Sequence, residues 1–421
     1  INLPSPQALA AEVVADTLAG RTLAQALDAT RLDPLPASMR GAVQDAAYGV
    51  PRYRGTLTAV LGQLVSRPLA DRYTQALLLV CLYQLLYTRG ARHAIVNNGV
   101  EAAPRKYRAL VNAVLRGFQR QQEHLLSQAR NTLEGRYNHP VWWVEKLQHE
   151  YPDQWDAILS ADQLHPPLTL RINRRNATSE QVLADLRTAE LPATQNGPWA
   201  ITLDRPVPVA RIPGFAEGRV SVQDAGAQWA AQLLDAQDGM RVLDACAAPG
   251  GKTGHLLELA DVELLALDAD EHRLERVQQN LERLQLSAEL KTGDAARPDS
   301  WWNGRPFDRI LADVPCSASG VVRRNPDIKW LRRPEDIPGF VLKQGQILGA
   351  LWQTLAPGGK LLYATCSIFV EENENEIGAF LSQHENARRL DLPSALQLQK
   401  GQLLPNVQHD GFFYALLEKR A

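Results

Sequence analysis

The stretch Val242-Leu243-Asp244-Ala245-Cys246-Ala247-Ala248-Pro249-Gly250-Gly251-Lys252-Thr253 decides the fold of this chain. It is typical of a strand that ends in a turn of small residues and leads into a helix. Small side chains let a ligand approach the backbone, and the first turn of a helix offers free N–H groups. The turn therefore predicts a ligand site more strongly than a tight turn without a ligand.

Two phosphate-binding patterns resemble this turn and neither fits it. Gly251-Lys252-Thr253 matches the end of a P-loop, but that pattern requires a glycine five residues before Gly251, where the chain has Cys246. The dinucleotide pattern G-x-G-x-x-G is also absent. The ligand is therefore expected to lack a phosphate group at this turn.

Strands and helices alternate on both sides of the turn, which predicts a doubly wound, mostly parallel α/β sheet of the Rossmann-like kind over residues 223–421. The segment Gly411–Leu417 is strand-like and is expected to add an antiparallel edge. The expected strands are Arg241–Ala245, Glu263–Asp268, Ala288–Thr292, Asp308–Asp313 and Lys360–Cys366. The expected helices are Thr253–Leu259, Glu271–Leu284, Ile337–Leu355 and Glu372–His384.

Acidic residues follow three successive strands. Asp268 closes the second strand, where a carboxylate suits hydrogen bonding to a ribose hydroxyl. Asp294 follows the third strand and could accept from a purine amino group, and Asp313 closes the fourth. Any one of them alone could be a helix cap, as we expect Asp270 to be. Together with the turn, they favour a nucleoside cofactor, and S-adenosylmethionine fits best.

Two cysteines occupy equivalent places at strand ends. Cys316 follows the fourth strand in Asp313-Val314-Pro315-Cys316-Ser317, and Cys366 ends the fifth in Thr365-Cys366-Ser367. Because parallel strands end at one edge of the sheet, both sulfurs should face one crevice. We interpret them as functional thiols rather than packing, and spacing does not say which is the nucleophile. Zinc is not expected, because no C-x₂-C pair or nearby histidine cluster accompanies them.

The charge of the chain is unevenly distributed. The 421 residues contain 45 Lys+Arg and 47 Asp+Glu, a net charge of −2. Residues 1–140, however, hold 16 Lys+Arg and only 9 Asp+Glu, which favours an anionic partner for the front of the chain. Residues 1–137 show only helical periodicity, with Cys81 in the core, and residues 138–222 are predicted to form a small α+β connector.

Composition excludes several classes of protein. A hydrophobic content of 45% and a charged content of 22% are ordinary for a globular chain and exclude a disordered, collagenous or membrane-bundle protein. The most apolar run, Gln75–Thr88, is shorter than the roughly 18 residues that a bilayer span needs. No signal segment opens the printed chain, which begins with Ile1, and its four cysteines are scattered. We expect a cytoplasmic monomer.

The motifs Asp244–Thr253, Asp313–Ser317 and Thr365-Cys366-Ser367 together resemble the Nol/Nop/Sun family of RNA cytosine-C5 methyltransferases. The flanking residues Leu170-Arg171-Ile172-Asn173 and Glu371-Glu372-Asn373 agree with it. The basic helical front resembles a NusB-type RNA-binding domain, a combination typical of bacterial 16S ribosomal RNA methyltransferases of the Sun type. The resemblance covers essentially the whole chain.

The resemblance implies residue roles that spacing alone does not. Cys366 would be the nucleophile, Cys316 would serve product release, and Asp313 would contact both cofactor and cytosine. Many members have Leu or Met where this chain has Ala245, which is a conservative departure. The residues implied in S-adenosylmethionine binding are Ala245, Cys246, Ala247, Ala248, Pro249, Gly250, Gly251, Lys252, Asp268, Asp294 and Asp313.

Alternative functions stay open at this point. Another RNA such as transfer RNA could be the substrate, or the chain could be a non-catalytic RNA-binding or antitermination factor. Tyr53, Tyr87 and other tyrosines among the arginines could stack bases or simply pack. A cationic stretch beside the Pro-Cys loop is expected to contact RNA phosphates; it comprises Arg323, Arg324, Lys329, Arg332 and Arg333.

Overall fold

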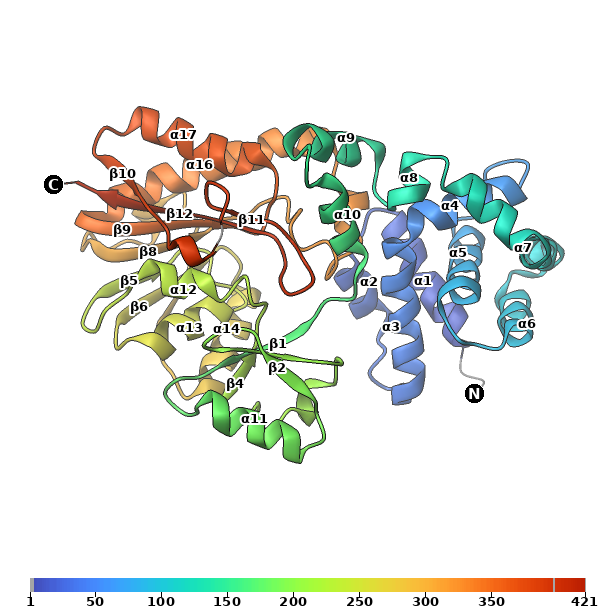
Figure 1. Cartoon of the computed structure of the whole chain (residues 1–421), viewed down its shortest axis with the longest axis horizontal. Coiled ribbons are helices and arrows are strands. Elements are labelled where there is room, and N and C mark those ends of the chain that lie inside the picture. The colour runs from blue at the N-terminus through green and yellow to red at the C-terminus, as the bar shows by residue number, and fades with distance from the viewer. Residues whose placement is uncertain (1–3, 397, 421) are drawn as a thin grey trace. The chain divides into compact units, whose positions relative to one another are not determined.

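The computed structural model describes residues 4–396 and 398–420 (Figure 1). The chain divides into two compact units. The first runs to Leu164 and includes the later segment Val322–Pro334, and the second contains His165–Val321 and Glu335 onward. In the described part of the chain, no helix is both long and apolar enough to cross a membrane.

The first unit is a helical bundle built around α5, the most apolar helix. Leu77, Cys81 and Phe118 are fully buried in its core, so the interpretation of Cys81 as a packing residue is confirmed. The rings of Tyr53 and Tyr87 stack on each other with centroids 3.9 Å apart, which favours packing over base stacking for this pair. The helices are α1 Pro6–Leu18, α2 Leu23–Thr30, α3 Ala37–Arg52, α4 Arg54–Leu64, α5 Arg72–Tyr87, α6 Arg92–Ala102, α7 Arg108–Ala129, α8 Leu133–Tyr137, α9 Val141–Glu150, α10 Trp155–Gln163 and α15 Ile328–Leu331.

Helices α9 and α10 and the segment Val322–Pro334 belong to the same compact unit as the helical bundle. The sequence analysis placed α9 and α10 with the rest of residues 138–222 in the connector. The segment Val322–Pro334 also docks there, because Asp327 accepts a hydrogen bond from the Leu23 N–H (2.8 Å) and the Trp330 indole donates to the Pro51 carbonyl (2.7 Å).

The expected RNA-facing role of the cationic stretch is wrong for two of its members. Arg323 and Lys329 are 1% and 0% exposed, and the Lys329 ammonium donates to the Arg52 carbonyl at 3.2 Å. The Arg52 guanidinium in turn donates to the Arg323 carbonyl at 2.6 Å. Charged groups this deeply buried are not available to phosphate, so these residues attach the segment to the bundle.

The second unit begins with a small antiparallel sheet of order β2-β3-β1-β4. Leu170, Ile172 and Val182 are among the buried residues of its own small core. Helix α11 starts with a capping box in which Thr178 and Gln181 satisfy each other's backbone N–H groups. The elements are β1 Leu168–Ile172, α11 Ser179–Thr188, β2 Ala193–Gln195, β3 Ala200–Leu203 and β4 Val220–Val222.

The large sheet has the order β10-β12-β9-β8-β5-β6-β7, with β11 paired to β12. The five neighbouring strands from β9 to β7 are parallel, which confirms the predicted doubly wound sheet. The last strand, β12, pairs antiparallel with β9 but is not at the edge as expected, because β10 pairs with its other side. The strands are β5 Arg241–Asp244, β6 Glu263–Asp268, β7 Glu289–Thr292, β8 Phe307–Asp313, β9 Leu355–Thr365, β10 Ala387–Leu390, β11 Gln402–Leu403 and β12 Phe412–Lys419.

Helices cover both faces of this sheet, with α16 and α17 on one side and α12, α13 and α14 on the other (Figure 1). β5 is buried along its whole length and β8 along most of it, and their central residues are apolar, as expected of parallel strands with two covered faces. The register pairs Asp244 with Leu311 and Asp313 with Ala364. The carboxyl ends of β5, β8 and β9 therefore form one edge. The helices are α12 Trp229–Leu234, α13 Gly251–Leu259, α14 Glu271–Leu284, α16 Ile337–Thr354 and α17 Glu374–Gln383.

Candidate active site

The small-residue turn is fixed by backbone bonds to two neighbouring strands. The Ala245 N–H donates to the Leu311 carbonyl and the Ala247 N–H to the Leu267 carbonyl, both at 2.9 Å. Gly250 precedes α13 with φ of +95°, and a Cβ there would lie 3.0 Å from the Val277 Cα. A side chain at this position would be strained and would press on α14. The turn thus presents backbone rather than side chains at the sheet edge.

Asp268 is bound directly to the turn. Its side chain is 4% exposed and accepts hydrogen bonds from the Ala248 N–H (3.0 Å) and the Asp270 N–H (3.2 Å). Asp270 itself caps α14 by accepting from the His272 and Arg273 N–H groups, which confirms its expected structural role. Asp268 therefore lies at the turn, as expected for a ligand-binding carboxylate, while Asp270 serves only the helix.

Asp244 is a site residue whose role the sequence analysis missed. It is 1% exposed, and one carboxylate oxygen accepts from the Thr253 hydroxyl at 2.7 Å, whereas Oδ1 has no hydrogen-bond partner among the described residues. Burial raises the pKa of Asp244 to about 7. A signal was present in the sequence, since Asp244 is an acid that follows the apolar pair Val242-Leu243 and directly precedes the small-residue turn.

The other two predicted acids are each paired with a lysine. Asp313 Oδ2 lies 2.5 Å from the Lys252 ammonium, and both oxygens of Asp294 lie 2.9 Å from the Lys343 ammonium. Burial opposes ionisation of Asp294, but the Ala296 N–H and Lys343 outweigh it, so its pKa is lowered. Lys343 comes from α16, and no sequence pattern near the acids indicated it.

The Lys252 side chain is 16% exposed and lies within electrostatic range of Asp313, Cys366 and Asp244. Burial alone would lower the pKa of its ammonium, but the nearby charges of Asp313, Cys366 and Asp244 leave that pKa above its ordinary value. The lysine therefore stays protonated at neutral pH. It supplies a fixed positive charge next to a thiol.

The two expected functional thiols are adjacent. The Sγ atoms of Cys316 and Cys366 lie 3.4 Å apart, and both side chains are partly exposed. The contact with Cys366, together with burial, raises the pKa of Cys316 well above its ordinary value. Burial also raises the pKa of the Cys246 thiol, assisted by the charges of Asp313, Asp244 and Asp268. Cys246 is thus an inert thiol that packs in the turn among carboxylates.

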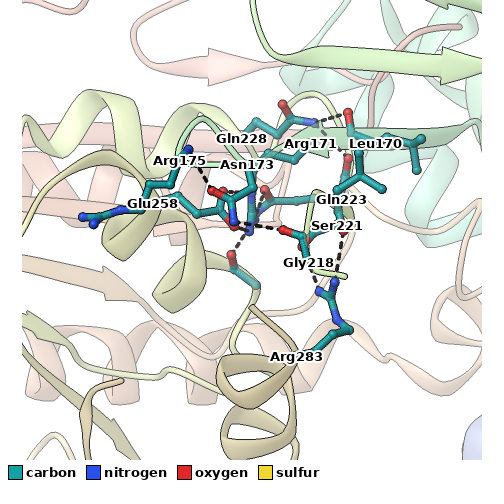
Figure 2. A network of polar contacts seen from close by, with 12 residues as sticks. Leu170, Arg171, Asn173, Arg175, Gly218, Ser221, Gln223, Gln228, Glu258 and Arg283 are labelled. Atoms are coloured by element: carbon teal, nitrogen blue, oxygen red, sulfur yellow. Dashed lines mark hydrogen bonds and ion pairs between the residues drawn. The ribbon is translucent and has the colours of Figure 1, made fainter. Parts of the chain in front are cut away.

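A buried polar network ties the small sheet to the cofactor turn (Figure 2). Arg171 of β1 is 1% exposed and forms a two-pronged ion pair with Glu258 of α13, at 2.6 and 2.9 Å. The same guanidinium donates to the Gln223 side chain and to the Gly251 carbonyl, each at 2.7 Å. Arg171 therefore holds the first turn of α13. The sequence analysis quoted this arginine only as a flanking residue and missed its role.

Arg283 of α14 makes the second attachment in this network. It donates to the carbonyls of Phe215 and Val220 at 2.8 and 3.0 Å and to the Ser221 hydroxyl at 2.9 Å. Its guanidinium also lies 4.3 Å from the centre of the Phe215 ring. The small sheet is therefore fastened to α13 and to α14, the two helices that follow the first two parallel strands.

Comparison with known proteins agrees with this arrangement. Residues 231–418 match the family described as 16S rRNA methyltransferase RsmB/F, residues 139–210 match its ferredoxin-like domain, and residues 5–120 match the NusB family. The chain is 44% identical to ribosomal RNA small subunit methyltransferase B of Pseudomonas syringae pv. tomato, over 99% of this chain and 97% of that protein. It is 45% identical to the protein of the same name from Pseudomonas putida, over 99% of both chains.

The chain belongs to the RsmB/F family of 16S rRNA methyltransferases. It is accordingly an enzyme that methylates ribosomal RNA, with a NusB-like helical domain before its catalytic sheet. Solved structures support the fold. The crystal structure of PH0851 matches with a TM-score of 0.79 and 24% identity over 100% of both chains. NSun6 from Pyrococcus horikoshii matches with a TM-score of 0.60 and 20% identity over 67% of this chain and 98% of that one.

The methyl donor is S-adenosylmethionine, and the residues at the sheet edge fit it. A sulfonium cation suits a site with the carboxylates of Asp244, Asp268 and Asp313, one of which has the unpartnered buried oxygen. Asp268 and Asp294 can accept from ribose hydroxyls and an adenine amino group, and the α13 N-terminus with Lys252 suits the carboxylate of the donor. Among the described residues, no group of His, Cys, Asp and Glu is arranged to hold a metal ion.

Proposed function

We propose that this enzyme transfers a methyl group from S-adenosylmethionine to C5 of a cytosine in 16S ribosomal RNA through a covalent cysteine–C6 adduct. The observation that carries the proposal is the 3.4 Å contact between the Cys316 and Cys366 sulfurs at the edge that also holds Lys252 and Asp313. A base-modifying enzyme that acts on an exocyclic nitrogen has no need of two adjacent thiols.

The chemistry explains why a thiol is required. C5 of cytosine is too weak a nucleophile to accept a methyl group directly, and addition of a thiolate to C6 makes the ring enamine-like. Cys366 is the proposed nucleophile, and the Lys252 ammonium lies within electrostatic range of its sulfur. Asp313 accepts a hydrogen bond from the N4 amino group of the base, and the adjacent Lys252 ammonium offsets the negative charge that develops on the ring. The cofactor supplies an electrophilic methyl group.

Bond formation and cleavage balance as follows. The Cys366 sulfur would form a bond to C6, and the electron pair of C5 would take the methyl group that S-adenosylmethionine supplies, which converts the sulfonium into a neutral thioether. Removal of the C5 proton then returns an electron pair to the ring, and the C6–S bond breaks to release Cys366 as thiolate. Methylcytosine and the neutral thioether are the products.

Cys316 is suited to act only after the adduct has formed. Its pKa is raised chiefly by its hydrogen bond to Cys366. When the Cys366 sulfur is bonded to C6 it no longer carries negative charge, so Cys316 becomes easier to ionise. In this proposal Cys316 then releases its proton to solvent and accepts the proton from C5. Addition of Cys366 to C6 would therefore precede proton removal by Cys316, because the state of the Cys366 sulfur affects the pKa of Cys316.

The RNA partner is supported by an unbalanced charge on the helical unit. The segment from Arg89 to Arg120, which includes α6 and most of α7, carries one acid, Glu101. Its basic side chains are all exposed, and none forms an ion pair with a described carboxylate. Unpaired basic side chains of this density fit a phosphate backbone. They are Arg89, Arg92, Arg105, Lys106, Arg108, Arg116 and Arg120.

A decisive test compares cells with and without the protein. Bisulfite sequencing of total RNA should show one or few 16S rRNA cytosines that are protected only when the protein is present. Protection confined to transfer RNA would show that transfer RNA is the substrate instead, and no change in any RNA would contradict C5 methylation.

We place the activity in the cytoplasm, where ribosomal RNA is made and assembled in bacteria. The target base must be unstacked or lie in a loop, because C6 is unreachable within a helix.

A further inference from the structure

A buried carboxylate contacts both of the loops that carry the two thiols. Glu372 ends the short helix Val370–Glu372 and is 0% exposed. Its Oε1 accepts from the Ser317 N–H at 2.8 Å, and its Oε2 accepts from the Ser317 and Ser367 hydroxyls, both at 2.5 Å. Ser317 directly follows Cys316 and Ser367 directly follows Cys366. One side chain therefore bonds the residue next to each thiol.

The surroundings of Glu372 hold its carboxylate in place. The Gln344 amide of α16 donates to Glu372 Oε1 at 3.0 Å and to the Pro315 carbonyl at 2.9 Å. The Tyr363 hydroxyl donates to the Glu372 backbone carbonyl at 2.7 Å. A buried carboxylate is costly unless its oxygens are hydrogen-bonded, and here four donors surround it. Such a compensated buried charge resists displacement.

Other hydrogen bonds also connect the two loops. The Gly320 N–H donates to the Cys366 carbonyl at 2.8 Å, and the Ser319 hydroxyl lies 2.9 Å from that of Ser367. The hydroxyls of Ser317 and Ser367, the residues next to the two thiols, also lie 3.1 Å apart, and Glu372 Oε2 accepts from both of them. A change in the separation of Ser317 and Ser367 would move both sulfurs relative to each other.

We propose that Glu372 is a positioning residue that sets the relative placement of Cys316 and Cys366. This inference rests on the proposed covalent mechanism. The hydrogen bonds of the Glu372 carboxylate go to protein groups, Ser317 and Ser367 among them, so it would act on the two sulfurs through these serines. The mechanism requires Cys366 to reach C6 while Cys316 reaches the C5 proton of the same base. A displacement of about 1 Å can reduce the rate about 100-fold.

The test uses Glu372→Ala and Glu372→Gln, with Glu376→Gln as a matched control. Glu376 is a second buried carboxylate, 8% exposed, on the adjacent helix α17, where burial raises its pKa. Purified full-length variants are assayed for methylation of 16S rRNA, for S-adenosylmethionine affinity by calorimetry, and for thermal unfolding. We expect kcat to fall about 100-fold in Glu372→Ala and less in Glu372→Gln, with unchanged cofactor affinity, and Glu376→Gln to keep kcat.

A second readout separates positioning from general support of the fold. In single turnover, Glu372→Ala should slow adduct formation and adduct release together, because both sulfurs shift. The double variant Ser317→Ala/Ser367→Ala, which keeps the carboxylate but removes its hydroxyl partners, should reproduce this loss if Glu372→Ala fails to fold. Wild-type kcat in either, or an equal loss in Glu376→Gln, would overturn the role of Glu372. Absence of C5 methylation by the wild-type enzyme would instead overturn the proposed function.

Discussion

The Lys252 ammonium and the Asp313 carboxylate lie 2.5 Å apart, although one follows β5 and the other ends β8. The pair joins the cofactor turn to the strand that precedes the Pro-Cys loop. Because Lys252 also interacts with Cys366, cofactor, base-contacting acid and nucleophile would share one electrostatic centre. The pair therefore connects the residues proposed to bind the cofactor with those proposed to act on the cytosine.

Replacing the proposed nucleophile should separate binding from chemistry. Cys366→Ala removes the sulfur that adds to C6, so methylation should fall to background. S-adenosylmethionine binding by calorimetry should stay within about threefold, because the turn and its acids are untouched. Full turnover by this variant would refute the assignment of Cys366.

Replacing the second thiol should block release rather than addition. Cys316→Ala leaves Cys366 able to attack but removes the group proposed to take the C5 proton. An enzyme–RNA band that survives denaturing electrophoresis should accumulate and should require S-adenosylmethionine. Normal activity with only free RNA on the gel would count against this role.

Removing the charge of Lys252 should change the pH dependence of the reaction. Lys252→Met removes the ammonium that lies within electrostatic range of the Cys366 sulfur, so kcat/KM should fall roughly 100-fold at neutral pH. The acidic limb of its pH profile should move to higher pH. Lys343→Met, which frees Asp294 instead, should weaken S-adenosylmethionine binding without moving that limb. A pH profile shared by wild type and Lys252→Met would exclude the electrostatic role.

The Arg171–Glu258 pair should contribute to both stability and cofactor affinity. Arg171→Met leaves Glu258 buried and unpaired, so the unfolding free energy should fall by about 3–5 kcal/mol in denaturant titrations. The double variant Arg171→Met/Glu258→Leu should regain most of this stability. Its S-adenosylmethionine affinity should stay reduced, because the Gly251 carbonyl has lost its donor. Recovery of both properties would show that the pair serves only the fold.

Lys329 should make the stability of the helical unit depend on pH. Burial lowers the pKa of Lys329 from 10.5 to about 7. The charge of Asp162 opposes this shift, whereas the charge of Arg52 adds to it. Between these values the unfolded chain binds a proton that the folded chain does not, so this group makes stability rise with pH by up to about 1.4 kcal/mol per pH unit. Below pH 7 the cost of burying the charge is present in full.

The variant Lys329→Met isolates this contribution. The difference in unfolding free energy between Lys329→Met and wild type should favour the variant most below pH 7 and shrink as the pH rises toward 10. Chemical unfolding followed at several pH values measures it. A difference that does not vary with pH would show that Lys329 is not neutral in the folded protein.

The sequence determined the features that arise from neighbouring residues. The strand–turn–helix pattern around Gly250 was sufficient to predict the doubly wound sheet. The acids and cysteines that follow its strands were sufficient to predict that Asp268, Asp313 and Cys366 lie at one edge. Parallel strands end on one side, so residues at their ends must gather there. The basic character of the helical front was likewise visible in composition.

Tertiary structure alone decided the partners of these residues. Lys343 reaches Asp294 from a helix 49 positions away, Arg171 reaches Glu258 across 87, and Glu372 joins two loops whose serines are 50 apart. It also placed β10 outside β12 and buried Arg323 and Lys329 in the helical unit. Local periodicity reports which face of an element is apolar, whereas a salt bridge or a docking segment depends on which elements pack together.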